Sequence, residues 1–412
     1  MSQVTAPDLR ENKMRTMPLG KLLFNMALPL VLSMLVQALY NVVDSVYVAG
    51  YSQNAVTALS LAFPIQNLQI GFATGAAVGM NSLLSKSLGE GDRERANRAA
   101  GNGIFLTLVF VVLFMLFGFF GAEAYYNMQN ISAETAKAGT EYSSICCSYT
   151  AGVFIGILGE RLLQASGKTI YTMFTQGTGA LLNILLDPLF IYGFEPLGIP
   201  EMGAAGAAVA TVIGQWVGAV MGIIFNATKN TDVQFALKYL RPSKEIMGKI
   251  LAVGVPSIIM MAIGSVMNFG MNQIFLGFEG IGETASGVFG IYFKLQSFFF
   301  MPLFGINNAA ISILAFNYGA RQPKRITGTL KRALGAAMTI MVAGMLLFQL
   351  VPDVLLGFFN PSDTFLAIGR SALRIVSLHF PLAAVGIVLG ASFQALGNGI
   401  YSTITSLMRQ LV

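Results

Sequence analysis

The sequence has little charge, little histidine and little cysteine. Only 11% of its 412 residues are Asp, Glu, Lys or Arg, and it contains one histidine and two cysteines. So small a share of charge does not fit the surface of an ordinary soluble domain. Cys146 and Cys147 are adjacent, which rules out the spacing of a disulfide framework or a zinc site. With a single histidine and no nucleophile motif, we expect neither an enzyme nor a resident cofactor.

Hydrophobic residues take the place of the missing charge and make up 55% of the chain. They gather in runs long enough to cross ~30 Å of hydrocarbon as helices that rise ~1.5 Å per residue. Because lipid offers no partner to backbone N–H and C=O groups, these runs predict an all-α polytopic membrane protein. We place spans at 22–49, 55–84, 97–121, 138–166, 168–194, 202–226, 246–277, 284–315, 328–357 and 364–396, followed by the start of an eleventh.

Basic residues gather in the N-terminal tail and in alternate loops, whereas the opposite loops hold only Lys137. By the positive-inside rule, we expect the N-terminus and the basic loops to face the cytoplasm across a cell membrane, inner or plasma. The net charge of +6 then reflects topology, and we expect no nucleic-acid partner. The basic positions are Arg10, Lys13, Arg15, Lys21, Lys86, Arg93, Arg95, Arg98, Lys168, Lys229, Lys238, Arg241, Lys244, Lys249, Arg321, Lys324, Arg325, Lys331 and Arg332.

The chain also repeats itself. LLQASGKTIYTM at 162–173 returns as SFQALGNGIYST at 392–403, and Pro29 in the first span matches Pro256 in the seventh. This self-similarity predicts two six-helix repeats of the same topology, which form two lobes of a twelve-helix protein. We assign residues 1–233 to the N-terminal lobe, 234–245 to a cytoplasmic linker and 246–412 to the C-terminal lobe.

The second repeat is shorter than the first. It contains helices seven to ten and only the start of the eleventh, about ten complete helices in the whole chain. Either the sequence is truncated or partial, or the last two helices were lost. We favour a truncated or partial sequence.

Two acids lie inside the predicted spans, Asp44 in the first and Asp187 in the fifth. An ionisable side chain at mid-membrane costs ~2.5–3.5 kcal/mol, so each acid is a functional candidate. Asn41 lies one turn before Asp44. Asn183 likewise lies one turn before Asp187, so each amide shares a helix face with its carboxylate. Facing helices would gather the four side chains into a pocket for H+ or Na+, and the structural alternative is that each acid binds a helix end or the kink at Pro188.

Methionine and phenylalanine are abundant, with 21 and 31 residues respectively. Soft and adaptable side chains that line a cavity suit a site for many different flat, lipophilic cations. Gln37 continues the polar face of the first span one turn away from Asn41. The substrate-binding candidates are therefore Gln37, Met260, Met267, Met271, Phe298 and Phe299.

Four more polar residues lie within spans. Glu160 and Arg161 either pair or line a cytoplasmic mouth, and we favour a structural role. Lys294 stays open between a functional amine and an ion pair within the bundle. His379, a lone imidazole, is expected to be a packing residue.

NILLDPLFIYGFEPLGIPEMGAAGAAVATVIGQ at 183–215 resembles the multidrug and toxin extrusion (MATE) family, as do MALPLVLSMLVQALYNVVDSVYVAG in the first span and the repeated motif. The similarity is greatest to the DinF-like and MepA-like bacterial branch. It implies two six-helix lobes and a cation site at Asp44, Asn183 and Asp187, where Na+ is one candidate ion. It also implies a more loosely matched member of that site, Thr211.

The expected function is secondary active multidrug efflux, in which lipophilic or cationic organic compounds are exchanged for H+ or Na+ by alternating access between the lobes. The partners we expect are the lipid bilayer and small drugs, and we expect a monomer. The alternative is a flippase for lipid-linked oligosaccharides or other lipids. A flippase would need a strongly cationic cavity for pyrophosphate, whereas the acids Asp44 and Asp187 are the deepest ionisable groups of the first lobe.

Overall fold

The structure, a computed structural model, describes residues 12–51, 53–128, 131–278, 280–357, 359 and 363–410. Within these ranges the chain is helical, apart from an isolated bridge between Phe194 and Ile199 and short turns. The first half contains α1 (Lys13–Thr16), α2 (Leu19–Tyr51), α3 (Gln53–Glu90), α4 (Arg93–Phe120), α5 (Ala122–Asn127), α6 (Ala133–Ser148), α7 (Ala151–Ala165), α8 (Thr169–Ile191), η2 (Glu195–Leu197), α9 (Ala204–Lys229) and η3 (Leu237–Leu240). The second half contains α10 (Lys244–Leu276), α11 (Gly282–Gly319), α12 (Pro323–Leu350), α13 (Pro352–Gly357), α14 (Asp363–Ser377), α15 (Phe380–Ala395) and α16 (Gly399–Gln410).

The predicted spans fall on these helices. Six described helices are long and apolar enough to cross a membrane, and eight spans result if each of two bent helix pairs counts as one. Each of the ten predicted spans overlaps a helix or a bent pair, and the predicted start of an eleventh is α16. The all-α class is therefore confirmed, because apolar runs of this length satisfy their backbone groups only as helices in lipid.

Three predicted spans need correction. The span at 138–166 is α6 and α7, which bend by 46°, and the span at 364–396 is α14 and α15, which bend by 44°. Pro381 lies in the first turn of α15, where a proline without an N–H is tolerated, so a helix restarts there. The span at 328–357 ends early at Leu350, because the residue before Pro352 is pushed out of the helical conformation.

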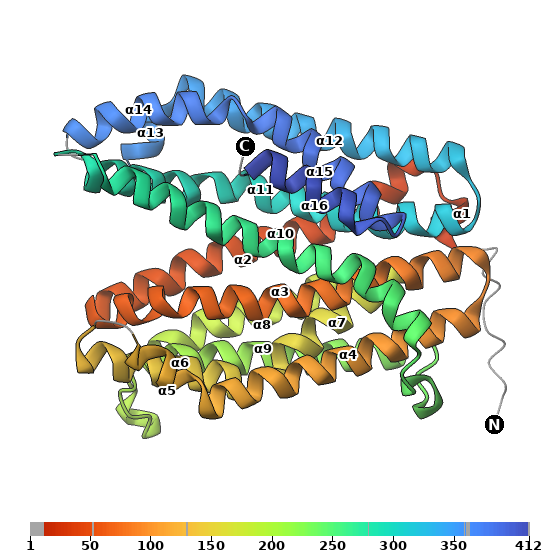
Figure 1. The fold of residues 1–412 in the computed structure, drawn as a ribbon, viewed down its shortest axis with the longest axis horizontal. Helices are drawn as coiled ribbons and strands as arrows, with labels where there is room; N and C mark the ends of the chain where they lie inside the picture. Colours follow the sequence, from red (N-terminus) through yellow and green to blue (C-terminus); the bar gives the residue numbers. More distant parts are fainter. Residues whose placement is uncertain are drawn as a thin grey trace.

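The second half repeats the first helix by helix. The helices α2 and α10 each have 33 residues, α3 and α11 each have 38, and α4 and α12 each have 28. A six-residue helix follows in both halves, and then comes a bent pair. In Figure 1, α11–α16 lie in one half of the molecule and α4–α9 in the other, with α2, α3 and α10 packed between them. The predicted two-lobed repeat is confirmed, while the exact boundaries 1–233 and 246–412 stay a prediction.

The two lobes meet through backbone contacts at one end of the bundle. We call the end that carries Arg93, Lys168 and Arg321 the basic end; α1 lies there in Figure 1. A Cβ atom on Gly89 of α3 would lie 1.9 Å from the carbonyl oxygen of Phe316 on α11. The contact is reciprocal, since a Cβ on Gly319 would lie 2.0 Å from the carbonyl oxygen of Lys86. Only glycine permits so close an approach of two helices.

The helix α1 lies against both lobes at the basic end. On the second lobe, the Asn317 amide and the Arg325 guanidinium donate to the carbonyl of Met14 at 3.2 and 2.9 Å, and Arg325 also donates to the carbonyl of Met17 at 2.8 Å. The Met14 side chain is fully buried. Residues 12–18, which precede the first long helix, are therefore part of the packed structure.

On the first lobe, α1 meets a small cluster of charges. Lys13 interacts with Lys168 and Asp232, and the Lys168 ammonium donates to the carbonyl of Lys229. Burial raises the pKa of the Asp232 carboxyl, and the charges of Lys168, Arg93 and Lys13 offset this effect only in part. The ionised form of Asp232 is therefore less favourable in the folded state than in the unfolded chain.

The raised pKa of Asp232 predicts how stability depends on pH. Ionisation of this carboxyl destabilises the folded state as the pH rises from the unfolded pKa, ~3.9, through the folded one. Asp232→Asn does not ionise, so we expect a higher melting temperature than wild type at pH 7 and no advantage near pH 4. Thermal unfolding of the detergent-purified protein at both pH values measures this difference. The exposed Asp363→Asn is the control, and an Asp232→Asn protein that melts lower at pH 7 would contradict the prediction.

The close contact of Gly89 and Gly319 at the basic end leads to a second testable prediction. Gly89→Ala overpacks the interface at a cost of ~1–3 kcal/mol, which the lobes relieve by parting. Ser312 is fully buried and bonded to Asn81 across this interface. In a protein with Cys146 and Cys147 replaced by alanine, a cysteine at Ser312 should react with a small maleimide at least about fivefold faster when Gly89 is alanine. Gly335→Ala, where the new Cβ meets no atom within 4 Å, should leave the rate unchanged.

Candidate functional site

The two acids predicted from the sequence meet inside the first lobe. Asp44 on α2 and Asp187 on α8 are close enough to interact, and Asp187 is completely buried. Both helices start at the basic end, and the acids lie in their last third, nearer the opposite end of the bundle. By strict hydrogen-bond geometry no donor among the described residues bonds either oxygen of Asp187 or Oδ1 of Asp44, although the two carboxyl groups lie within hydrogen-bonding reach of each other and Asn183 lies within reach of Asp187. Buried carboxylate oxygens without donors are rare, because each one loses its hydration without replacement.

Neutral side chains from three helices complete the site. The Asn183 amide donates to the Thr211 hydroxyl on α9 at 3.2 Å, and both residues are buried. The Asn183 oxygen has no partner among the described residues. Tyr40, one turn before Asp44, shares a hydrogen bond with Thr211 and lies within electrostatic range of both acids. The helices α2, α8 and α9 thus contribute five oxygen-bearing side chains to one buried cluster.

Two further residues extend the cluster toward α3 and α6. The Gln66 amide donates to the Tyr142 hydroxyl at 2.8 Å, and Tyr142 interacts with Asp44 and Tyr40. Sequence reasoning missed Tyr40, Gln66 and Tyr142. Helical spacing from Asp44 would have found Tyr40. Gln66 and Tyr142 carry no such signal, because they reach the site only through the packing of α3 and α6 on α2.

The donor set fits a small monovalent cation. It offers two carboxylates, the unpartnered amide oxygen of Asn183 and hydroxyl groups, which are the hard ligands that Na+ takes, while a carboxylate pair is also able to hold a proton. Among the described residues, no group of three or more His, Cys, Asp or Glu side chains gathers to hold a metal ion. The side chain of Asn41, which we also predicted here, lies outside what the structure describes.

The predicted substrate residues are spread over several places. Gln37 and Phe298 are exposed, and Met267 and Met271 are half-buried on α10. The sulfur of Met260 accepts a hydrogen bond from Ser402 on α16 at 3.3 Å. That the six line one substrate site stays a prediction. The sixth, Phe299, packs in the aromatic core of the second lobe against Phe348 and Phe380, with ring centroids 5.9 and 6.3 Å away.

Of the remaining polar candidates, Glu160, Arg161 and His379 make contacts within the bundle, whereas Lys294 is exposed. Glu160 accepts hydrogen bonds from Gln176 at 2.7 Å and Thr175 at 3.5 Å, so α7 and α8 are joined there, and it also lies within electrostatic range of Arg161. The Arg161 guanidinium donates to Gln164. His379 packs on the rings of Phe300 and Phe380, which agrees with a packing role.

Two helical lobes of equal topology, with paired acids buried inside one of them, define a polytopic membrane transporter. The MatE family model matches residues 29–189 and again 256–412, so it covers both repeats. The chain belongs to the MATE family.

Known relatives agree with this assignment over nearly the whole chain. The multidrug export protein MepA of Staphylococcus saprophyticus is 23% identical over 95% of this chain and 84% of its own length. A solved structure described as the outward-facing conformation of a multidrug resistance MATE family transporter is 26% identical, covers all of this chain and 89% of its own, and superposes with a TM-score of 0.90. A transporter from Pyrococcus furiosus, whose description says that its binding pocket has reverse polarity and suggests a different function, is also 26% identical, with 99% and 89% covered and a TM-score of 0.89.

The hydrogen bonds of Thr211 lead to a testable difference between two threonines. Thr211→Val keeps the shape but leaves the Asn183 amide without its acceptor, so we expect a loss of ~1–3 kcal/mol in stability. Thr329 on α12 is also buried, and its hydroxyl has no partner among the described residues. Thr329→Val should therefore be neutral or stabilising. Thermal unfolding of both variants in detergent measures the difference, and equal effects would contradict the assigned role of Thr211.

Proposed function

We propose that the protein exports lipophilic or cationic organic compounds in exchange for H+ or Na+, by alternating access between its two lobes. The observation that supports this most strongly is the Asp44 and Asp187 pair, two acids that interact with each other inside one lobe, where Asp187 is completely buried. Two carboxylates in a medium of low dielectric constant repel each other unless a cation lies between them. The pair therefore links the presence of an ion to how closely α2 and α8 approach.

The distribution of basic residues bears on the orientation of the protein in the membrane, and so on the direction of transport. We propose that the basic end faces the cytoplasm, since basic loops are retained there. The closed glycine contact between the lobes is then cytoplasmic, and the acids lie nearer the outside. A cation that enters from outside reaches Asp44 and Asp187 without crossing the closed contact. One charge that moves down a potential of 100 mV supplies ~2.3 kcal/mol, which is enough to shift an equilibrium between two conformations.

Each of the two helices that carry the acids contains a proline, a residue at which a helix is able to bend. Pro29 lies within α2, and Pro188 lies within α8 directly after Asp187. Each proline removes one backbone hydrogen bond from its helix, so bending at that point breaks no further bond. We propose that a cation at the site changes the bend of α2 and α8 and so changes the space available to a bound drug in the first lobe.

The flippase alternative receives less support. A lipid-linked oligosaccharide carries a pyrophosphate, which would require cations at the site. The ionisable groups that the structure gathers there are acids.

Transport in proteoliposomes tests the proposal. The purified full chain is reconstituted, and export of a fluorescent organic cation is followed under an imposed pH gradient and, separately, an imposed Na+ gradient. We expect Asp44→Asn and Asp187→Asn each to abolish gradient-driven export, because a neutral amide no longer attracts the coupling ion. The gradient that drives the wild type identifies that ion.

The matched control is Asp353→Asn. Asp353 is an exposed acid of the second lobe that pairs with Arg370 at 2.8 Å, far from the site in sequence and on a different lobe. Its removal should leave export unchanged. Gradient-driven export that persists in both site variants would reject the coupling role of the two acids.

A further inference from the structure

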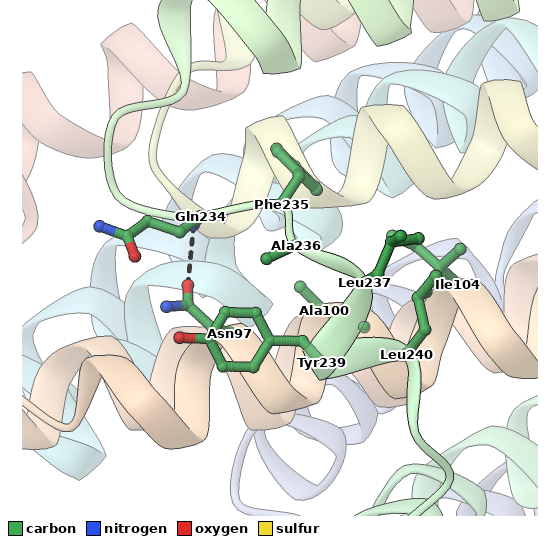
Figure 2. A pocket seen from close by; sticks show the side chains of 10 residues that line it. Asn97, Ala100, Ile104, Gln234, Phe235, Ala236, Leu237, Tyr239 and Leu240 are labelled. Atoms are coloured by element: carbon green, nitrogen blue, oxygen red, sulfur yellow. Dashed lines mark hydrogen bonds between the residues drawn. The ribbon is translucent and has the colours of Figure 1, made fainter.

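The segment that joins the lobes, residues 230–243, is folded onto the first turns of α4. The Asn97 side chain accepts a hydrogen bond from the backbone N–H of Gln234 at 2.8 Å (Figure 2). The Asn102 side chain accepts one from the backbone N–H of Ser243 at 2.7 Å. The segment is thus tied to α4 near both of its ends, although its composition suggested only a polar linker.

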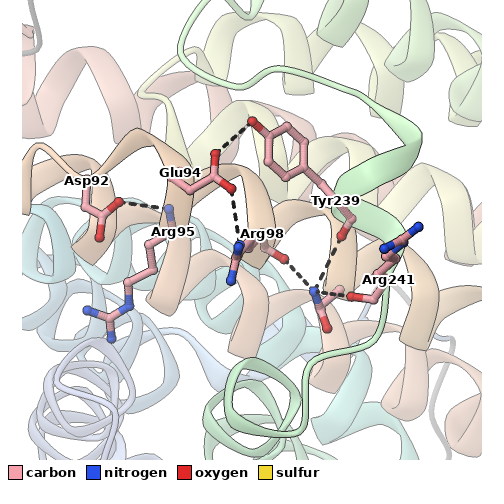
Figure 3. Close-up of polar contacts among 7 residues, drawn as sticks. Asp92, Glu94, Arg95, Arg98, Tyr239 and Arg241 are labelled. Carbon is pink, nitrogen blue, oxygen red and sulfur yellow. Dashed lines mark hydrogen bonds and ion pairs between the residues drawn. The ribbon is translucent and has the colours of Figure 1, made fainter.

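Further contacts hold the middle of this segment. Asn102 also donates to the carbonyls of Tyr239 and Arg241 at 3.5 and 3.4 Å, and the Tyr239 hydroxyl donates to Glu94 at 3.0 Å (Figure 3). Gly101 allows the backbones to touch, since a Cβ there would lie 2.1 Å from the Tyr239 carbonyl oxygen. The segment therefore has a fixed shape on the helix.

A pocket of about 260 Å³ lies between the segment and α4. Its walls are mostly apolar and include Ala100 and Ile104 of α4 together with Phe235, Leu237 and Leu240 of the segment (Figure 2). This volume is just below the ~300–1,000 Å³ typical of sites for whole small molecules. It suits part of a flexible apolar chain.

The rim of the pocket is apolar and exposed. Leu237 is 84% exposed and Phe235 is 46% exposed, on the side of α4 where Leu108 is also exposed. Ala100 and Ile104 lie roughly 10–17 Å from the start of α4 at Arg93, given a rise of ~1.5 Å per residue. If α4 begins at the membrane surface, that depth is the outer part of the acyl-chain region, just below the headgroups.

Cations flank the same rim. Lys238 and Arg241 form no ion pair with any described residue, and the Lys238 ammonium lies 4.6 Å from the centre of the Tyr239 ring. Arg98 differs, because it pairs with Glu94 at 3.2 Å. Two cations outside any close salt bridge with a described residue therefore stand beside an apolar pocket at the basic end, although Lys238 also interacts with Glu94.

We propose that this pocket binds an anionic phospholipid. An acyl chain enters between α4 and the segment, while the phosphate lies between Lys238 and Arg241. The arrangement joins the two forces that bring a lipid to such a surface, burial of methylene groups and attraction of an anionic headgroup to juxtamembrane cations. The site lies outside the ion site and at the opposite end of the first lobe.

The internal repeat provides a comparison within the same chain. The helix α12 corresponds to α4 and has the same 28 residues, so Lys331 occupies the position of Gly101. A lysine there leaves no room for a backbone to lie as close to the helix as the Tyr239 carbonyl lies to Gly101. The basic end of α12 thus has cations at the same depth but a lysine where α4 has the glycine that lets the segment approach.

Lipid binding by the purified full chain tests the proposal. In dodecyl maltoside, the protein is titrated with dioleoylphosphatidylglycerol or dioleoylphosphatidylcholine, and bound lipid is counted by native mass spectrometry. We expect tighter binding of the phosphatidylglycerol. A doubly substituted Lys238→Ala and Arg241→Ala protein should lose about 25-fold in affinity for it, about fivefold per cation, and little for phosphatidylcholine. Ala236→Leu, which fills the pocket without a change of charge, should weaken binding of both lipids.

The control is Lys324→Ala with Lys331→Ala on α12. It removes two cations from the same end of the bundle and should change the phosphatidylglycerol affinity by less than about twofold if the pocket on α4 selects the lipid. An equal loss in this control would overturn the proposal, and so would an Ala236→Leu protein that binds as the wild type does. Because the readout is bound lipid, a failure here is distinct from a failure of ion-coupled export.

Discussion

Burial of the Asp187 carboxylate requires the neighbouring helices α2 and α9 to pack closely on α8. A carboxylate away from water requires a counter-ion, a proton or donors, and α8 brings only one amide, on Asn183, to the same face. The remaining oxygens come from α2 and α9, which must therefore lie very close to α8. Close packing is achieved by glycine, since a Cβ on Gly214 of α9 would lie 2.6 Å from the carbonyl oxygen of Gly179 on α8. The small residues of α8 and α9 are thus what allows Thr211 to reach Asn183.

The parts of the fold that sequence predicts are those with a local physical signal. Apolar runs predict the spans, and helical spacing places Asn183 on the face of Asp187, because both effects depend on neighbours along one helix. The break between α6 and α7 has no such signal, as no proline or glycine stands at Ser148 to Thr150. Likewise Tyr142 reaches the site only because α6 packs on α2 and α3. Tertiary contacts of this kind depend on how whole helices pack against one another, and helical spacing within one segment does not predict that packing.

The two lobes share a backbone plan but differ in the chemistry of their interiors. Counted from the proline that both helices contain, Pro29 in α2 and Pro256 in α10, the position of Asp44 is taken by Met271. The interior of the second lobe is aromatic instead, with rings of Tyr292, Phe299, Phe348 and Phe380 in contact. The position of Asp44 thus differs in chemistry between the two copies of the repeat, although the helices that carry it, α2 and α10, have the same length.

The helix α1 contacts both lobes at the basic end, so its contacts bear on any separation of the lobes there. Toward the second lobe, Asn317 and Arg325 donate three hydrogen bonds to its backbone. Toward the first lobe, Lys13 is attracted by Asp232 and repelled by Lys168. The contacts with the second lobe are hydrogen bonds that include a charged guanidinium, which are among the stronger ones in proteins. The helix α1 thus joins both lobes at the basic end, and a separation of the lobes there has to break one of these two sets of contacts.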